Sequence, residues 1–401
     1  MQAEKDRKRT EEAIVTDEER TIYFDHAATT RVRKCAHQAM IPFLDMDFGN
    51  PSSLHGPGLA AKKAIQQSRA KIAALLGCES NEILFTSGGT ESDNWAIEGY
   101  LFGNPKAGKH IITSAIEHPA VIRTCEFMKR FGYELTVLPV TGEGIVTPES
   151  VARAIRPDTA LISIQTANNE IGTIEPIREI GAIAEERGVA FHTDAVQAVG
   201  VLPIFLKNLP VTMLSASGHK FGGPKGVGFL YVKNGTKLEP LLHGGPQEKR
   251  MRAGTENVPA IVGMAAALSE AMEQGTGKTA EIRDYLQERI LAEIPDVIVN
   301  GANRLPGSLS VSIAGVEASS VLVFLDLAGI AASGGSACSS AENKPSSVLQ
   351  AIGVSEPYLS GTVRFTVGAD NTKEEAEYVV KVLKESVGKL RGVGRGERHI
   401  E

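Results

Sequence analysis

The sequence has few cysteines, few aromatic residues and no long apolar run. Its four cysteines lie far apart in 401 residues, without the CxxC spacing of a zinc or redox site. A chain this long without a signal peptide is not expected to carry a disulfide framework. We therefore expect the protein to be located in the cytoplasm, which is reducing. No apolar stretch is long enough to cross a membrane, and no membrane association is expected.

An excess of positive charge is also missing. The chain has 42 Lys and Arg against 48 Asp and Glu, a net charge of -6, which gives no reason to expect nucleic-acid binding. Its 42% hydrophobic and 22% charged residues are ordinary for a globular protein of two domains. Residues 1–21 are dense in charges of both signs and lack the apolar core of a signal peptide, so we expect a solvated extension.

After Ile22, short apolar strands alternate with helical patterns. The predicted strands include ELTVLPV, ALISIQTA, VAFHTDA, TMLSAS and VGFLYV. This alternation predicts an α/β fold with a mostly parallel sheet that helices cover on both faces. Ligands of such sheets bind beyond the carboxyl ends of the strands. A boundary near Gly275 is followed by a second α/β unit, whose last helix is predicted to start with a capping box of Thr372 and Glu375.

Two strand ends carry residues suited to a phosphorylated ring cofactor. In SGGTESDN, from Ser87 to Asn94, glycines and Thr90 could hold a phosphate at a helix start, although a tight turn with a capped helix is the alternative. In FHTDAVQAVG, Asp194 could pair with a protonated ring nitrogen, although its residue type equally suits a helix cap.

The segment SASGHK places Ser217, His219 and Lys220 after another apolar strand. A lysine amine captures aldehydes, including that of pyridoxal phosphate (PLP). A solvated surface lysine is the alternative. The order along the chain, a glycine turn, then an aspartate strand, then a lysine strand, favours PLP binding.

Four other polar residues lie in loops or at strands. His118 in IEHPAV could stack on a flat cofactor or be an ordinary loop residue, and Asn168 and Asn169 in ANNEIG could simply form a turn. Arg364 in TVRF suits a substrate carboxylate or a structural ion pair.

Cys338 lies among small residues in SGGSACSS, which favours a reactive thiol in a loop. The other cysteines are expected to be structural: Cys35, Cys78 and Cys125.

These motifs, in this order, resemble the class I cysteine desulfurases of iron–sulfur cluster assembly and nitrogenase maturation. The resemblance also covers YFDHAATT, FGNPSSLHGPG and RAGTEN, and it runs from about Tyr23 to about Arg391. It implies the fold-type I PLP-dependent transferase fold. The large PLP-binding domain would span 32–275, with a smaller C-terminal α/β domain of 22–31 and 276–401 that carries the catalytic cysteine loop.

The resemblance also implies a role for each matching residue. Lys220 would form the Schiff base with PLP, Asp194 would pair with the pyridine nitrogen, Gln197 would donate to the ring hydroxyl oxygen, and His118 would stack on the ring. The phosphate ligands would be Gly89, Thr90, Ser217 and His219, with Thr255 reaching in from the second subunit of a homodimer. Asn169 would contact the cofactor and, with Arg364, orient the substrate carboxylate.

The implied activity converts L-cysteine to L-alanine, with Cys338 attacking the substrate sulfur and carrying it as a persulfide to a protein acceptor such as an iron–sulfur scaffold. Selenocysteine lyase uses the same machinery, and a non-catalytic sulfur-relay adaptor is the alternative outside enzymes.

No metal site is expected. Pro246 and Arg250 stand where the family usually has glycine. The C-terminus lacks the longer tail with which housekeeping members engage the scaffold, so docking to it stays open.

Overall fold

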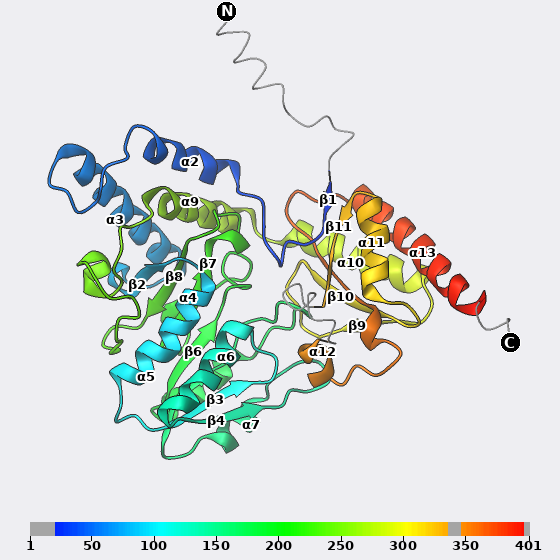
Figure 1. Cartoon of the computed structure of the whole chain (residues 1–401), viewed down its shortest axis with the longest axis horizontal. Helices are drawn as coiled ribbons and strands as arrows, with labels where there is room; N and C mark the ends of the chain where they lie inside the picture. Colours follow the sequence, from blue (N-terminus) through cyan, green and yellow to red (C-terminus); the bar gives the residue numbers. More distant parts are fainter. Residues whose placement is uncertain (1–20, 336–345, 397–401) are drawn as a thin grey trace, which may run out of the picture.

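The computed structural model of the chain describes residues 21–335 and 346–396. Its larger body is built on a seven-stranded sheet with the order β2-β8-β7-β6-β5-β3-β4 (Figure 1). The strands are β2 (Ile83–Thr86), β3 (His110–Ser114), β4 (Glu134–Leu138), β5 (Thr159–Ser163), β6 (Ala190–Asp194), β7 (Met213–Ser217) and β8 (Gly228–Val232). Only β8 runs antiparallel to its neighbours, so the predicted mostly parallel sheet is confirmed.

Successive residues of these strands contribute to two different cores. In β7, for example, Leu214 packs into one hydrophobic cluster and Met213 into the other. This is the period of two that a strand buried on both faces requires. Helices on the Leu214 side are α3 (Gly56–Leu76), α7 (Pro148–Ala154), α8 (Ile177–Glu186) and α9 (Val258–Gln274), with α2 (Lys34–Leu44) packed on α9. Helices on the Met213 side are α4 (Gly89–Asn94), α5 (Tyr100–Gly103) and α6 (Pro119–Met128), with a π-helical turn at Trp95–Gly99 joining α4 to α5.

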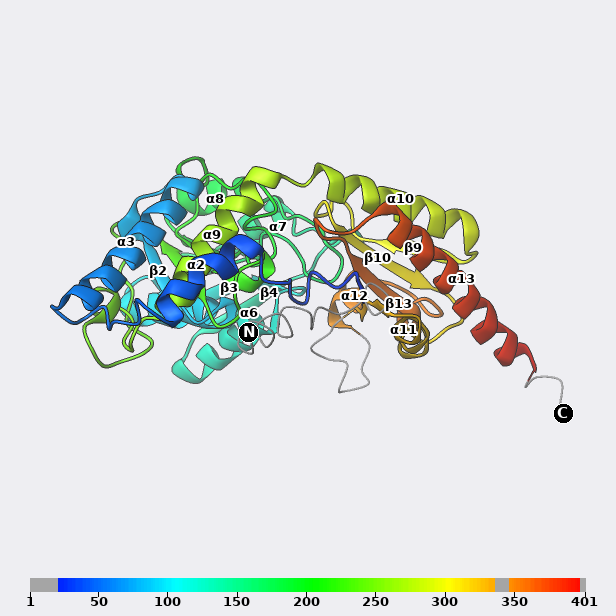
Figure 2. The same ribbon diagram turned by 90° about the horizontal axis from the view of Figure 1, so that it is seen from above.

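The smaller body has a four-stranded antiparallel sheet with the order β12-β13-β10-β9. Its strands are β9 (Val297–Asn300), β10 (Ser308–Ile313), β12 (Ser333–Gly334) and β13 (Thr362–Thr366). Three helices share its core and cover the sheet in Figure 2: α10 (Gly277–Glu293), α11 (Ala318–Leu327) and α13 (Lys373–Gly396). At the start of α13, Thr372 and Glu375 exchange side chain-to-backbone hydrogen bonds of 3.1 and 3.2 Å, which confirms the predicted capping box.

The beginning of the described chain packs with the smaller body. β1 (Ile22–Tyr23) pairs in parallel with β11 (Ile330–Ala331), and Phe24 is buried in the core of the smaller body. The domain boundaries given above stay a prediction. No helix in residues 21–335 or 346–396 is both long and apolar enough to span a membrane.

Candidate active site

The expected site residues gather where the strands of the large sheet end. β6 ends at Asp194, β7 ends at Ser217 just before Lys220, and β3 ends four residues before His118. Because β2 runs in the same direction as β7, its following turn at Gly88 reaches the same edge. This edge is where a doubly covered parallel sheet binds ligands.

The amine of Lys220 points to the beginning of the described chain. Its Nζ donates hydrogen bonds to the backbone carbonyls of Ala27 and Ala28, the latter at 3.0 Å. The side-chain amide of Gln197 donates to the same Ala27 oxygen at 3.1 Å, and the Ala27 N–H donates to Thr366 Oγ1 in the smaller body at 3.1 Å. Lys220 is therefore held at the junction of the two bodies and is not the solvated surface lysine of the alternative interpretation.

Next to Lys220 lies a cleft of about 1180 Å³, which is large enough for a cofactor and a small substrate. Lys220, Gln197 and Asn169 are among the residues that line it. A second, smaller hollow is lined by Thr90 and His118.

The glycine turn before α4 has the conformation that the motif predicts. Gly88 has φ +152°, which favours glycine, and a Cβ atom at Gly89 would lie 2.6 Å from Val196 Cγ2. The Thr90 side chain is exposed and Ser217 is buried. Because Val196 packs against Gly89, a side chain at position 89 would not fit.

His219 contacts the beginning of the described chain and is neutral at ordinary pH. Its Nδ1 is 3.0 Å from Thr29 Oγ1. Burial, followed by the charges of Lys220 and Lys225, lowers the pKa of His219 to about 4. A neutral ring leaves one nitrogen as a hydrogen-bond donor toward an anion.

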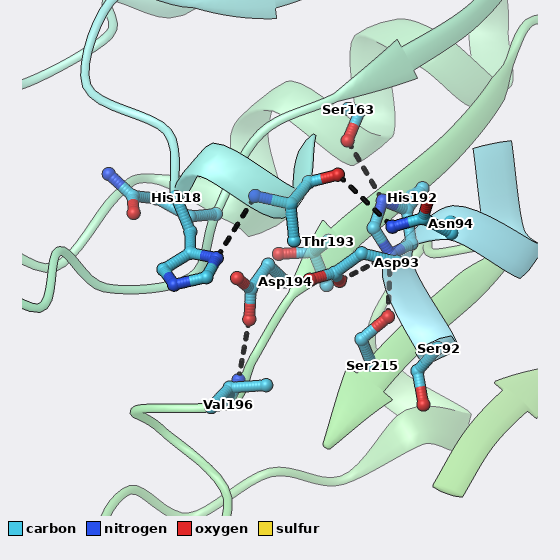
Figure 3. A network of polar contacts seen from close by, with 12 residues as sticks. Ser92, Asp93, Asn94, His118, Ser163, His192, Thr193, Asp194, Val196 and Ser215 are labelled. Atoms are coloured by element: carbon cyan, nitrogen blue, oxygen red, sulfur yellow. Dashed lines mark hydrogen bonds and ion pairs between the residues drawn. The ribbon is translucent and has the colours of Figure 1, made fainter. Parts of the chain in front are cut away.

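Asp194 and His118 face each other across the centre of the site (Figure 3). Asp194 Oδ1 accepts from the Val196 N–H at 2.8 Å, and because residues 195–200 form turns it is not the helix cap of the alternative interpretation. Burial raises the pKa of Asp194, while His118, the Val196 N–H and Lys220 oppose this rise. His118 Nδ1 accepts from the Ala120 N–H at 3.1 Å, which leaves Nε2 to carry the ring proton.

Arg364 on β13 is 1% exposed and joins three segments of the chain. Its guanidinium donates to the Asn169 carbonyl at 2.8 Å and to Asp25 at 2.7 Å, while Ser333 Oγ donates to the other Asp25 oxygen at 2.7 Å. The structural ion pair is therefore present. Within the described part of the chain, Arg364 Nε is buried without a hydrogen-bond partner.

In the ANNEIG turn the two asparagines differ. Asn168 Oδ1 accepts from the Glu170 and Ile171 N–H groups at 2.8 and 2.9 Å, so Asn168 forms the turn. Both asparagines are among the residues that line the cleft, and the Asn169 backbone carbonyl accepts from Arg364.

One expected residue, Thr255, is not brought into the site by this chain, and another cannot be placed in it. Thr255 is exposed, and the described residues offer its hydroxyl no hydrogen bond. Cys338 lies outside the described residues.

Sequence reasoning did not single out Asp25, Asp93 or the carbonyls of Ala27 and Ala28. Asp25 and both alanines lie in YFDHAATT, and Asp93 lies in SGGTESDN. These motifs pointed to the site but did not show which of their residues make contacts there.

Comparison with known proteins places this geometry in a family. Residues 22–379 match the family described as Aminotransferase class-V. The curated cysteine desulfurase IscS of Dictyoglomus turgidum is 50% identical over 379 residues, which cover 93% of this chain and 96% of that protein. The IscS of Methanosarcina thermophila is also 50% identical, over 94% of this chain and 95% of that protein. The chain belongs to the cysteine desulfurases of the class-V aminotransferase family.

Solved structures agree with this cysteine desulfurase assignment. A NifS-like protein matches with a TM-score of 0.86 and 35% identity, over 92% of this chain and 99% of that one. A structure described as SspA in complex with cysteine matches with a TM-score of 0.78 and 39% identity, over 86% of this chain and 99% of that one. The fold-type I architecture expected of this cysteine desulfurase is therefore confirmed.

Proposed function

We propose that the protein uses PLP to remove sulfur from L-cysteine, releasing L-alanine and retaining the sulfur as a persulfide on Cys338. The observation that carries this proposal is the meeting of the Lys220 amine, the buried Asp194 carboxyl group and the His118 ring at one edge of the sheet. The relatives named as cysteine desulfurases, and the related SspA structure in complex with cysteine, support the choice of substrate.

The residues present fit PLP as a set of donors and acceptors. Lys220 would bind its aldehyde carbon, Asp194 its ring nitrogen and Gln197 its ring hydroxyl oxygen, with His118 against the ring face. The turn at Gly88 leads into the start of α4, and the backbone N–H groups of a helix start suit a phosphate. Its further ligands would be Gly89, Thr90, Ser217 and His219, together with Thr255 of a second copy. When bound, PLP would withdraw electrons from the substrate α-carbon.

The chain's own residues would then move protons and hold the substrate. Arg364 Nε, buried and without a partner among the described residues, would donate to the substrate carboxylate, and Asn169 would contact the same group. Lys220 would carry the α-proton, because its amine lies at the edge of the cleft that the substrate must enter.

The sulfur step would belong to Cys338. Its thiolate would attack the substrate sulfur, so that an S–S bond forms while the substrate C–S bond breaks. The pair of electrons from that bond would stay on carbon, which takes up a proton and becomes the methyl group of alanine. A free thiol has a pKa of about 8.5, so the thiol proton must be accepted by a neighbouring base. His118 is our candidate, and it would take the proton on Nδ1 in place of the hydrogen bond from the Ala120 N–H, since Nε2 already carries the ring proton.

We further propose a homodimer in the cytoplasm that passes the persulfide sulfur to a protein acceptor such as an iron–sulfur scaffold. The exposure of Thr255 in a single chain supports the dimer, because this hydroxyl finds no partner within its own described chain.

The central test replaces the thiol and leaves the PLP site intact. Cys338→Ser should bind PLP but should form no persulfide and release alanine at a small fraction of the wild-type rate, since a hydroxyl group is a poor nucleophile toward sulfur. Cys35→Ser, at a half-buried cysteine, is the matched control and should behave as wild type. Mass spectrometry would detect the bound sulfur, beside alanine quantification.

Wild-type rates of alanine and sulfide release by Cys338→Ser would show that the mechanism is wrong. Lys220→Ala should lose the borohydride-reducible link between the protein and PLP, together with turnover. If it kept both, a role for Lys220 would be excluded. A comparison of kcat/KM for cysteine and selenocysteine would separate the desulfurase from a selenocysteine lyase.

A further inference from the structure

A second carboxyl group, that of Asp93 on α4, lies beside Asp194. Asp93 is 1% exposed, and its Oδ1 has no hydrogen-bond partner among the described residues. Carboxylate oxygens of Asp93 and Asp194 and a ring nitrogen of His118 all lie within 4.8 Å of one another. Figure 3 shows Asp93 beside Asp194, with His192 and Ser215 on its other side. Two buried carboxyl groups this close do not both ionise.

The nearest base to Asp93 cannot neutralise it. His192 Nε2 lies 3.7 Å from Asp93 Oδ1. Both ring nitrogens of His192 already have hydroxyl partners, Ser163 Oγ at 2.8 Å and Ser215 Oγ at 2.9 Å. Burial lowers the pKa of His192 to about 3, so the ring is neutral. Asp93 therefore has no cation in contact with it.

Asp194 has the opposite surroundings. The charges of His118 and Lys220 act on it, and the Val196 N–H donates to its Oδ1. Glu117, the other acid near Asp93, is itself buried, and burial raises its pKa well above the ordinary value. The titratable groups around Asp93 are thus Glu117 and His118 before α6, Cys125 on α6, His192 and Asp194 on β6, and Lys220 after β7. Any single negative charge of the pair belongs on Asp194.

We propose that Asp93 is a positioning residue that stays protonated, so that its neutral carboxyl group keeps the negative charge on Asp194, the partner of the PLP ring nitrogen. This inference rests on the proposed function for the role of Asp194. It assigns to Asp93 a neutral hydrogen-bonding role, which an asparagine can replace and a leucine of similar size cannot. Burial and the adjacent Asp194 raise the pKa of Asp93, as this assignment requires.

The first test uses the protein without PLP and measures the pH dependence of its thermal unfolding. A protonated Asp93 in the folded state loses its stabilising effect as pH rises, because the unfolded chain ionises at its ordinary pKa of about 3.9. Asp93→Asn cannot ionise. The unfolding temperature of Asp93→Asn relative to wild type should therefore rise between about pH 5 and about pH 8. A difference that stays constant or falls would overturn the proposal, since an Asp93 ionised in both the folded and the unfolded state predicts a constant difference over this range.

The second test measures PLP affinity by titration of the same proteins. Asp93→Asn should stay within about threefold of wild type, whereas Asp93→Leu should bind PLP about tenfold more weakly or worse, because one buried hydrogen-bonding group is lost. Asp194→Asn is the control for loss of the ring partner and should also weaken binding. Infrared difference spectra of wild type minus Asp93→Asn should contain the band of a protonated carboxyl group.

Each outcome decides the proposal. Equal weakening by Asp93→Asn and Asp93→Leu, or no weakening by either, overturns it, as does a carboxylate band in the infrared difference spectrum. If Asp93→Leu does not fold, the unfolding and infrared measurements on Asp93→Asn still decide. If wild type does not bind PLP, the proposed function is wrong. The unfolding measurements without PLP would still show whether Asp93 is protonated.

Discussion

Arg364 shows how one residue can serve both structure and ligand binding. Asp25 and the Asn169 carbonyl fix two nitrogens of its guanidinium, and Nε stays unpaired among the described residues. The TVRF motif indicated an arginine with either a substrate or an ion pair. The sequence could not show that Arg364 can form an ion pair and still offer a nitrogen to a ligand. Asp25, its ion-pair partner, lies 339 residues away and meets Arg364 only through the tertiary fold.

Asp25→Asn should lower the free energy of unfolding by about 2–3 kcal/mol, because it leaves a buried guanidinium without its counter-charge while the hydrogen-bonding shape is kept. Chemical denaturation would measure this. Asp158→Asn is the matched control, since Asp158 pairs with Arg156 at the surface and its loss should change stability little. Equal effects of the two substitutions would show that the Arg364 pair is not a buried structural contact.

Glu175 is a buried acid outside the site. Its Oε2 accepts from the Val146 N–H at 2.9 Å, and Oε1 has no partner in the described ranges. Burial raises the pKa of Glu175 to about 8. The unfolded chain loses this proton near its ordinary pKa, so the stabilising contribution of Glu175 is complete below about pH 4 and declines as pH rises to the folded value.

Glu175→Gln should therefore gain stability over wild type as pH rises from about 5 to about 8, by at most about 1.4 kcal/mol per pH unit. Urea denaturation at several pH values would measure the difference. The control is Glu186→Gln at an exposed position of α8, which should show no such trend. A flat difference for Glu175→Gln would mean that Glu175 is ionised in the folded protein.

At the scale of elements, the order of strands, turns and helices could be predicted, because most strands of the large sheet are apolar runs that end at a polar residue. The Gly88 turn and the capping box at Thr372 form between residues that are close in sequence, so a local pattern is enough to predict them. The path before Thr255 could not be predicted. Glu248, Lys249 and Arg250 have φ of 43°, 59° and 70°, which glycine favours.

A long-range ion pair holds this strained segment. Glu248 is buried, accepts from both terminal nitrogens of Arg69, one of them at 2.8 Å, and accepts from the Phe85 N–H at 3.0 Å. The segment is thereby attached to β2 and α3. Since Arg69 and Glu248 are 179 residues apart, no local pattern could show that the left-handed backbone is stabilised in this way.

Arg250→Gly should be more stable than Arg250→Ala by about 1 kcal/mol, because a left-handed residue with a Cβ atom is strained and glycine is not. The Arg250 side chain is exposed, so both substitutions remove the same small set of contacts. Thermal and urea unfolding of the two variants would measure the difference. Equal stability would show that residue 250 does not have a positive φ in solution.

At the scale of the whole molecule, exposed apolar side chains gather at one end of the larger body. They lie on α2, α3 and the segment between them: Ile41, Leu44, Met46, Phe48, Leu54 and Leu59. Leu54 is 91% exposed. Figure 1 shows α2 and α3 at the end of the molecule away from α11 and α13. Clustered apolar exposure of this kind is typical of an association surface, and with the proposed homodimer its occupant is a second copy of the chain.

The double substitution Phe48→Glu and Leu54→Glu should convert the dimer to a monomer, because the new carboxylates would have to be buried without partners. Its affinity for PLP should fall as well, since the hydroxyl of Thr255 from the second copy would be lost from the phosphate site. The matched control is Val323→Glu with Leu327→Glu, which adds the same charge to exposed positions of α11 and should leave the dimer intact. Sedimentation equilibrium and PLP titration would follow both properties. A wild-type monomer with full PLP occupancy would contradict the shared site, and a dimer that survives Phe48→Glu with Leu54→Glu would place the contact on another face.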